Sequence, residues 1–271
     1  MKLVKDLFIS ARPTQWTKNL AVFAAIFLGG NLLDETKLTR TAITFVAFCL
    51  IASCSYFIND LFDKSSDRLH YRKKNRPVAT GEISPLVAFL SATILAVFSL
   101  TIALFVSKGV FLLICLYLAV QLGYNLFLKQ IILLELLVIA FGFMIRVFAG
   151  SFASHTALSS WLILTVMMLS LFLAIGKRRS EATLLGKLAT KHRPTLSEYP
   201  LNLLDGLVFL SATSSLLTYS LYTFNQPARS PGVDLLKFLP TTLASPKWLM
   251  ITIHIVVYGI FRYLYLIFDK K

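Results

Sequence analysis

Tyr56-Phe-Ile-Asn-Asp-Leu-Phe-Asp-Lys-Ser-Ser-Asp67 decides how this chain is interpreted, because here a long apolar run ends in closely spaced polar side chains. If the segment is helical, these side chains fall near one face over about two turns. They are Asn59, Asp60, Asp63 and Asp67. Carboxylates that face one another repel, and Mg²⁺ neutralises such oxygen ligands economically. The basic residues just beyond, between Arg68 and Arg76, indicate that an anion binds in the same place.

The composition around this stretch is that of a membrane protein. Of the 271 residues, 56% are hydrophobic and only 15% are charged, which is too little charge for the surface of a soluble chain of this length. The net charge of +14 raises nucleic acid as a partner, but basic loops facing the cytoplasm and anionic lipid explain it better. We therefore expect a bilayer environment and no nucleic acid.

Apolar runs near 20 residues long predict an all-α polytopic membrane protein with eight transmembrane helices. The predicted spans lie at about 17–33, 41–60, 86–107, 109–128, 131–152, 158–176, 203–224 and 247–267. The short connections predict that the third, fourth and fifth spans are antiparallel neighbours. No cleavable signal peptide is evident before the first span.

The loop charges predict the orientation of the spans. Lys and Arg concentrate in alternate loops, which the positive-inside rule assigns to the cytoplasm. Both termini and the loops 60–85 and 177–200 then lie on the cytoplasmic side of the cell (inner) membrane. The acidic stretch is expected there too, where a soluble substrate can meet a membrane lipid.

The order Asn59-Asp60-x-x-Asp63-x-x-x-Asp67-Arg68, followed by Lys73, Arg76-Pro77 and Gly81, resembles the first acidic motif of the UbiA superfamily of intramembrane transferases. In that family the Asp residues hold Mg²⁺ on a diphosphate leaving group, whose growing charge the metal and nearby cations meet. The resemblance implies one UbiA-like domain over residues 1–271, with helices around a central cavity capped by loops 60–85 and 177–200. The alternative is a solvated acidic helix end that pairs with its own basic neighbours.

Motifs along nearly the whole chain resemble the decaprenyl-phosphate phosphoribosyltransferase branch of this family. They are Ala11-Arg12-Pro13-x-Gln15-Trp16-x-Lys18-Asn19, Tyr124-x-x-x-x-Lys129, Arg146-x-x-Ala149-Gly150, Ser160-Trp161, Lys177-Arg178-x-x-Glu181 and Tyr258-Gly-x-x-Arg262-Tyr263. Aromatic prenyltransferases of the superfamily carry a second Asp-rich motif after the sixth span, where this chain has the basic segment Gly176-Lys-Arg-Arg-Ser-Glu181. A site that grips further phosphate anions is the better interpretation of that segment.

The branch implies a pentosyltransferase that moves 5-phosphoribosyl from phosphoribosyl diphosphate to a polyprenyl phosphate of decaprenyl type and releases diphosphate. A role in cell wall biogenesis follows if the organism builds arabinose-containing envelope glycans. Homo-oligomerisation stays open. The branch continues into a ninth helix, which we expect to be absent from this chain.

Asp60, Asp63 and Asp67 are the predicted catalytic residues and ligands of a Mg²⁺ cofactor. The predicted substrate-binding residues are Asn59, Lys18, Arg68, Lys73, Arg76, Tyr124, Lys129, Glu135, Arg146, Lys177, Arg178 and Glu181. Lys73 and Arg76 are expected to neutralise the leaving group. A second cation, namely Lys177, Arg178 or Lys129, is expected to hold the 5-phosphate or the lipid phosphate.

Two of these residues have competing interpretations. Glu135 stands where the branch has Asp, and it either binds ribose or metal or pairs with Lys129 or Arg146. Arg146 is predicted to lie roughly 16 Å along the helix from Glu135. A charge at that depth needs a partner or a wet cavity. A structural ion pair or a helix-end cap competes with direct substrate contact.

Two other functions remain open at this stage. One is a prenyltransferase that moves an isoprenoid from a prenyl diphosphate to an aromatic acceptor, which the missing second Asp-rich motif disfavours. The other is a non-catalytic lipid-binding or transport protein. Such a protein has no evident need for Asp60, Asp63 and Asp67 together, so the acidic stretch favours an enzyme.

Overall fold

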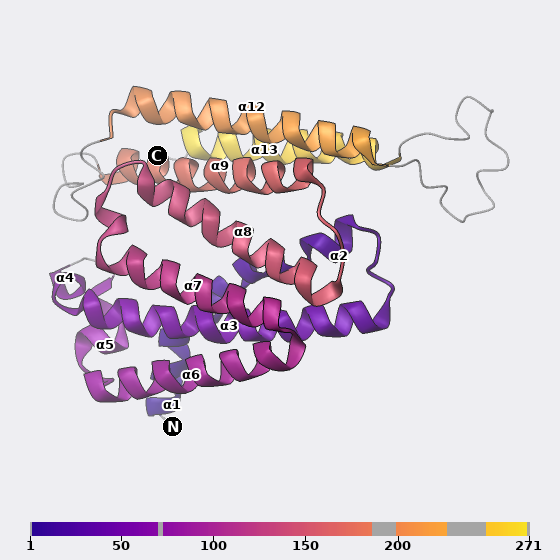
Figure 1. The fold of residues 1–271 in the computed structure, drawn as a ribbon. Coiled ribbons are helices and arrows are strands. Elements are labelled where there is room, and N and C mark those ends of the chain that lie inside the picture. Colours follow the sequence, from indigo (N-terminus) through magenta and orange to yellow (C-terminus); the bar gives the residue numbers. More distant parts are fainter. Residues whose placement is uncertain (1, 70–72, 186–198, 227–247, 270–271) are drawn as a thin grey trace, which may run out of the picture. The chain divides into compact units, whose positions relative to one another are not determined.

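The computed structural model describes residues 2–69, 73–185, 199–226 and 248–269. Every element in these ranges is a helix, which confirms the predicted all-α class (Figure 1). In chain order they are α1 (Lys2–Ala11), η1 (Pro13–Phe23), α2 (Ala24–Leu28), α3 (Glu35–Phe62), α4 (Lys64–Leu69), η2 (Lys73–Asn75), α5 (Pro77–Thr80), α6 (Pro85–Val106), α7 (Lys108–Leu126), η3 (Leu128–Gln130), α8 (Leu134–Ser154), α9 (Ser160–Leu185), α12 (Leu201–Asn225), η7 (Trp248–Ile251) and α13 (Thr252–Asp269). They divide into two compact units, Met1–Leu158 and Ser159–Lys271.

In the described part of the chain, seven helices are long and apolar enough to cross a membrane. The predicted count of eight is therefore not confirmed, and the difference lies at the predicted span 17–33. There the chain forms the 3₁₀-helix η1, then the short helix α2, which ends at Leu28 just before Gly29. Polar residues such as Lys18 and Asn19 in η1 also lower the hydropathy of this segment.

Capping residues define where three of the long helices of the first unit, α3, α6 and α7, begin. Asp34 accepts a hydrogen bond from Lys37 N (3.0 Å) at the start of α3. Ser84 and Ser107 cap α6 and α7 in the same way, through Val87 N and Val110 N. Such side-chain caps satisfy amide groups that have no partner within the helix. As predicted, α6 packs against α7 and α7 packs against α8 (Figure 1).

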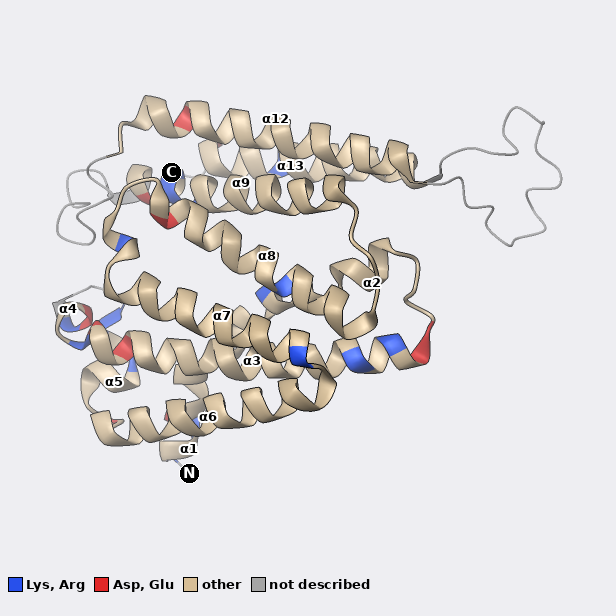
Figure 2. Cartoon of the chain, in the orientation of Figure 1, with Lys and Arg blue, Asp and Glu red and all other residues tan. Residues whose placement is uncertain are grey.

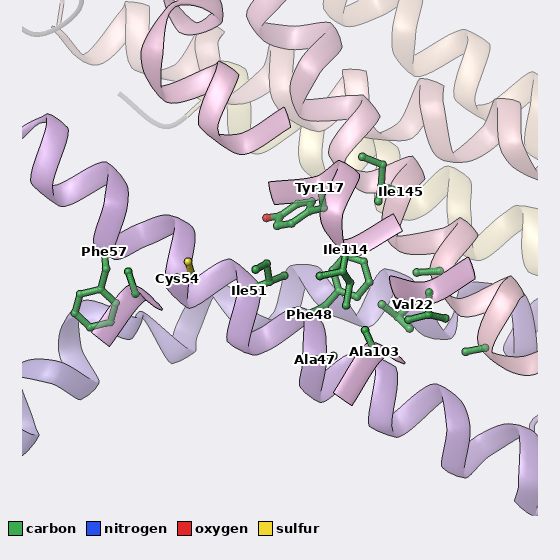
Figure 3. Close-up of a cluster of buried hydrophobic side chains, with 14 of the residues drawn as sticks. Val22, Ala47, Phe48, Ile51, Cys54, Phe57, Ala103, Ile114, Tyr117 and Ile145 are labelled. Carbon is green, nitrogen blue, oxygen red and sulfur yellow. The ribbon is translucent and has the colours of Figure 1, made fainter. Parts of the chain in front are cut away.

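The core of the first unit lies where α3 meets α6, α7 and α8. Figure 3 shows Phe48 and Ile51 of α3 beside Ile114 and Tyr117 of α7. The rings of Phe48 and Tyr117 meet edge to face, with 5.6 Å between centroids, which is a favourable aromatic geometry. This core fixes the long helices that carry the polar residues described below.

The 3₁₀-helix η1 lies directly against α8 and α3. At Gly150 of α8, an added Cβ would lie 1.8 Å from the carbonyl oxygen of Val22, so only glycine permits this backbone approach. Trp16 Nε1 donates to Ser53 Oγ of α3 (3.0 Å), and Ser53 Oγ donates to the Ala11 carbonyl (2.9 Å). These contacts fix the chain on both sides of Arg12.

The second unit contains α9, α12 and α13. Tyr263 of α13 packs its ring against Phe172 of α9 (5.1 Å between centroids) and donates to the Leu173 carbonyl (3.2 Å). The predicted loop 177–200 is partly wrong, because α9 continues to Leu185. Residues 186–198 of that loop lie outside the described residues.

The loop 60–85 also contains more helix than predicted. α3 continues to Phe62, and α4, η2 and α5 follow it. Residues 70–72 lie outside the described residues.

Candidate functional site

The acidic motif folds as the end of α3 and the start of α4, with Asp63 between them. Asp60 lies in the last turn of α3 and Asp67 lies on α4; both are 2% exposed. Asp63 N donates to Asn59 O (2.9 Å) and Asp67 N donates to Asp63 O (2.7 Å), so helical hydrogen bonding continues across the junction. Figure 2 shows acidic and basic residues gathered along the ribbon at this end of α3, beside α4 and α5.

Arg76 joins the two buried carboxylates. Its Nη1 lies 3.1 Å from Asp60 Oδ1 and 2.5 Å from Asp67 Oδ2. Arg76 has an extended backbone just before Pro77 and the start of α5, which suits a residue that precedes proline. Lys73 Nζ lies 3.9 Å from Asp67 Oδ1. The structure thus brings together four residues of the predicted site: Asp60, Asp67, Lys73 and Arg76.

Arg12 completes this cluster, and the sequence did not identify it as a site residue. Its guanidinium forms an ion pair with Asp60 and lies over the ring of Tyr56, 4.8 Å from the centroid. Its φ of 52° is in the left-handed region, which is rare for a residue with a side chain. Burial lowers the pKa of Arg12, which Asp60 partly offsets, but a guanidinium remains charged near neutral pH. The available signal was the motif Arg12-Pro13 itself.

Asp63 has a different partner from the other two carboxylates. Lys129 Nζ of η3 lies 2.7 Å from Asp63 Oδ1, and both side chains are partly exposed. This ion pair ties the end of α3 to the connection between α7 and α8. The predicted role of Lys129 in phosphate binding stays a prediction, as does the metal-binding role of Asp63.

The remaining predicted residues of the first unit lie around this end of the helices or deeper. Arg68 Nε donates to the Ala79 carbonyl (2.9 Å), which ties α4 to α5. Glu135 is fully buried in the first turn of α8, and Tyr124 is half-buried on α7. Lys18 is exposed on η1, and Asn59 is half-buried on α3.

Arg146 is buried in α8 and bonded to neutral groups. Its guanidinium donates to Asn19 Oδ1 (2.8 Å), to the Gly142 carbonyl (2.7 Å) and to the Tyr117 hydroxyl (2.8 Å). It also lies over the rings of Tyr117 and Phe143. In the described ranges no carboxylate forms an ion pair with it, so the predicted structural ion pair is not found there. Its bonds connect η1, α7 and α8.

In the second unit, the basic segment of α9 is paired with carboxylates. Arg178 is buried, and its Nη1 lies 2.6 Å from Glu181 Oε2. The exposed Lys177 lies 3.8 Å from the same carboxylate. Arg179, which was not predicted as a site residue, binds Asp205 of α12 (2.7 Å). The predicted phosphate-binding roles of Lys177 and Arg178 stay predictions.

The donor chemistry of the acidic motif fits Mg²⁺. Asp60 and Asp67 offer oxygen ligands, and Asp60 Oδ2 is buried without a hydrogen-bond partner in the described structure. No three His, Cys, Asp or Glu side chains in the described ranges are grouped closely enough to hold a metal ion as they stand. Arg76 bridges Asp60 and Asp67, and Lys129 holds Asp63. Arg76 therefore occupies one oxygen of each of the two carboxylates that would hold a metal ion.

The all-helical fold and the acidic motif at the end of α3 agree with the resemblance noted in the sequence. Residues 19–271 match the family model described as the UbiA prenyltransferase family, and the chain belongs to this family. It is similar to the decaprenyl-phosphate phosphoribosyltransferase of Mycolicibacterium smegmatis, with 37% identity over 83% of this chain and 72% of that protein. It is also similar to the protein of the same name from Mycobacterium tuberculosis, with 34% identity over 89% of this chain and 82% of that protein.

The solved structures that resemble this chain share its fold at low sequence identity. One is a UbiA homolog from Archaeoglobus fulgidus bound to GPP and Mg²⁺, with a TM-score of 0.71, 16% identity, and coverage of 97% of this chain and 99% of that chain. Another structure of a UbiA homolog from the same organism is bound to DMAPP and Mg²⁺, with a TM-score of 0.69, 15% identity, and coverage of 98% of this chain and 100% of that chain. The family and the named relatives establish that this protein is a transferase.

Proposed function

We propose that the protein transfers 5-phosphoribosyl from phosphoribosyl diphosphate to a polyprenyl phosphate in a Mg²⁺-dependent reaction. The observation that carries this proposal is the buried pair Asp60 and Asp67, which shares Arg76 at the end of a membrane-spanning helix. The names of the relatives, at 34 and 37% identity, supply the acceptor and the group transferred.

The reaction is a displacement at C1 of the ribose. An oxygen of the lipid phosphate forms a bond to C1 while the bond from C1 to the diphosphate oxygen breaks. The diphosphate keeps the electron pair of the broken bond. The nucleophile is already an anion, so the reaction needs no strong general base. The main requirement is to stabilise the charge that develops on the diphosphate.

The chain supplies carboxylates and cations for this task. Asp60 and Asp67 are the residues that would hold Mg²⁺, with Asp63 as a further candidate, and Mg²⁺ when bound neutralises diphosphate charge. Arg76 and Arg12 both form ion pairs with Asp60, and Lys73 forms one with Asp67. When the carboxylates take a metal, these cations become available to bind diphosphate oxygens. Arg12 is thus added to Lys73 and Arg76 as a ligand for the leaving group.

The site is proposed to face the cytoplasm, in the inner membrane of the cell. There, water-soluble phosphoribosyl diphosphate reaches the acidic motif directly, and the lipid phosphate reaches it along the bilayer. The concentration of Lys and Arg in the loop 60–85 supports this orientation. Lys177 and Arg178 are retained as proposed ligands for a second phosphate.

Purified protein in proteoliposomes, given phosphoribosyl diphosphate labelled in the ribose and a polyprenyl phosphate, tests the proposal. We expect Mg²⁺-dependent formation of labelled lipid, with at least a hundredfold loss in Asp60→Asn and in Asp67→Asn, on the order of the loss of a group that stabilises developing charge. Asp34→Asn is the matched control, because Asp34 caps the opposite end of the same helix and asparagine caps equally well.

Failure to form labelled lipid with acceptors of several chain lengths would reject this function. If the same protein instead moves a prenyl group from a prenyl diphosphate to an aromatic acceptor, the alternative within the family holds. The sequence of α9 disfavours that alternative, since it contains a single acidic residue, Glu181, and no second Asp-rich motif.

A further inference from the structure

The helix α1 (Lys2–Ala11) buries two polar residues and exposes several apolar ones, while Leu7 and Ala11 on its inner side pack against the core. Asp6 and Ser10, one turn apart, are buried at 7% and 2% exposure and face the protein. Val4, Phe8 and Ile9 are exposed, with Val4 at 71% and Phe8 at 61%. A helix beside water normally buries its apolar side, and exposed apolar side chains gathered on one side of a helix are typical of a surface that contacts a membrane or a partner.

Both ends of α1 are fixed at the same end of the long helices. Lys2 Nζ lies 2.9 Å from Glu82 Oε1, just before α6 begins at Pro85. At the other end, Arg12 binds Asp60 in the last turn of α3. The carbonyl of Ala11, the last residue of α1, also accepts from Ser53 in the last third of α3, so both anchors lie toward the end of the spans where α3 ends and α6 begins. α1 therefore lies near this end of the spans and does not run their full length.

The length of α1 leads to the same conclusion. Ten residues of α-helix are about 15 Å long, half of the roughly 30 Å hydrocarbon thickness of a bilayer. A short helix with an apolar outer side, placed where spans leave the bilayer, fits the boundary between headgroups and acyl chains. The exposed Lys5 lies one turn from Ile9 on that outer side, where its charge complements anionic lipid.

We propose that α1 is an interfacial helix whose outer side binds the membrane leaflet next to the acidic motif. Val4, Phe8 and Ile9 insert among the upper acyl chains, and Lys5 contacts anionic phospholipid headgroups. α1 is continuous with Arg12, so the lipid surface holds the residue that pairs with Asp60. This proposal concerns membrane docking and does not depend on which group the enzyme transfers.

Spin labels in the full-length protein test the depth of α1. Phe8→Cys, with Cys49, Cys54 and Cys115 replaced by Ala, is labelled and placed in nanodiscs of phosphatidylcholine with phosphatidylglycerol. Val97→Cys of α6 and Lys74→Cys of η2, both exposed positions, are the hydrocarbon and water references. The accessibility of each spin label to oxygen and to a water-soluble nickel complex measures how deep that label lies in the bilayer.

We expect the label at position 8 to prefer oxygen, as at position 97, at a depth of roughly 5–10 Å below the phosphates. Removing phosphatidylglycerol should reduce the ratio of inserted to water-exposed label about fivefold, and Lys5→Gln should abolish this lipid dependence. A label at position 8 as accessible to nickel as that at position 74 would overturn the proposal. So would dipolar coupling between labels on different copies, which would assign the outer side of α1 to a second copy of the chain.

Discussion

Replacing Arg76 by Gln tests the electrostatics of the acidic cluster. Asp60 and Asp67 are 2–3% exposed in their side chains, and Arg76 Nη1 contacts both. Removing one partner from a buried ion pair costs about 3–5 kcal/mol, because a charge stays behind in a poorly hydrated site. We expect roughly 3 kcal/mol here, since Arg12 remains on Asp60 and Lys73 remains near Asp67.

Thermal unfolding in detergent, with and without Mg²⁺, measures this loss. A cost of roughly 3 kcal/mol lowers Tm by roughly 6–12 °C in a chain of this size. Mg²⁺ should raise Tm more in Arg76→Gln than in the parent protein. In the variant, Mg²⁺ no longer competes with the Arg76 guanidinium for the carboxylates. Lys74→Gln, an exposed change in the same loop, is the control. If both variants unfold at the same temperature, or if Mg²⁺ stabilises them equally, the reasoning is refuted.

Two further pairs of substitutions test the packing and the ion pairing of the first unit. Gly150→Ala should destabilise the protein by about 1–3 kcal/mol, because its Cβ would meet the Val22 carbonyl, whereas Gly206→Ala on α12 meets no atom within 4 Å and should raise Tm. An unchanged Tm in Gly150→Ala would show that η1 does not touch α8. Lys129→Met and Asp63→Asn should show a coupling of about 1 kcal/mol in a double-mutant cycle of unfolding, and additive effects would show that they do not interact.

Hydropathy predicted most of the fold because each long helix carries its own apolar run. The elements from α3 to α13 that cross the membrane by length and composition lie within several residues of the predicted spans. The predicted span at 17–33 failed partly because its polar residues lower its hydropathy and partly for a nonlocal reason. In η1, Asn19 accepts a hydrogen bond from Arg146, and the Val22 backbone packs against Gly150. Each contact joins residues that are more than a hundred positions apart in the sequence. No window along the sequence contains that information.

The candidate site was predictable where its residues are neighbours in sequence. Asp60, Asp67 and Arg76 occur within one short segment, and Arg76 joins the two carboxylates as their spacing suggested. The third predicted carboxylate, Asp63, pairs with Lys129 instead. Which cation binds which carboxylate was not predictable. Arg12 is 48 residues from Asp60, and Lys129 is 66 residues from Asp63, so both pairs arise from helix packing.

The identity of the transferred group is the central claim, and one competition measurement tests it most directly. Proteoliposomes with Mg²⁺ receive phosphoribosyl diphosphate, a prenyl diphosphate, a polyprenyl phosphate and an aromatic acceptor together, and mass spectrometry identifies the lipid product. We predict a polyprenyl phosphate that has gained one phosphoribosyl group, absent in Asp60→Asn and present in Asp34→Asn. A prenylated aromatic product, with the polyprenyl phosphate unchanged, would contradict the account.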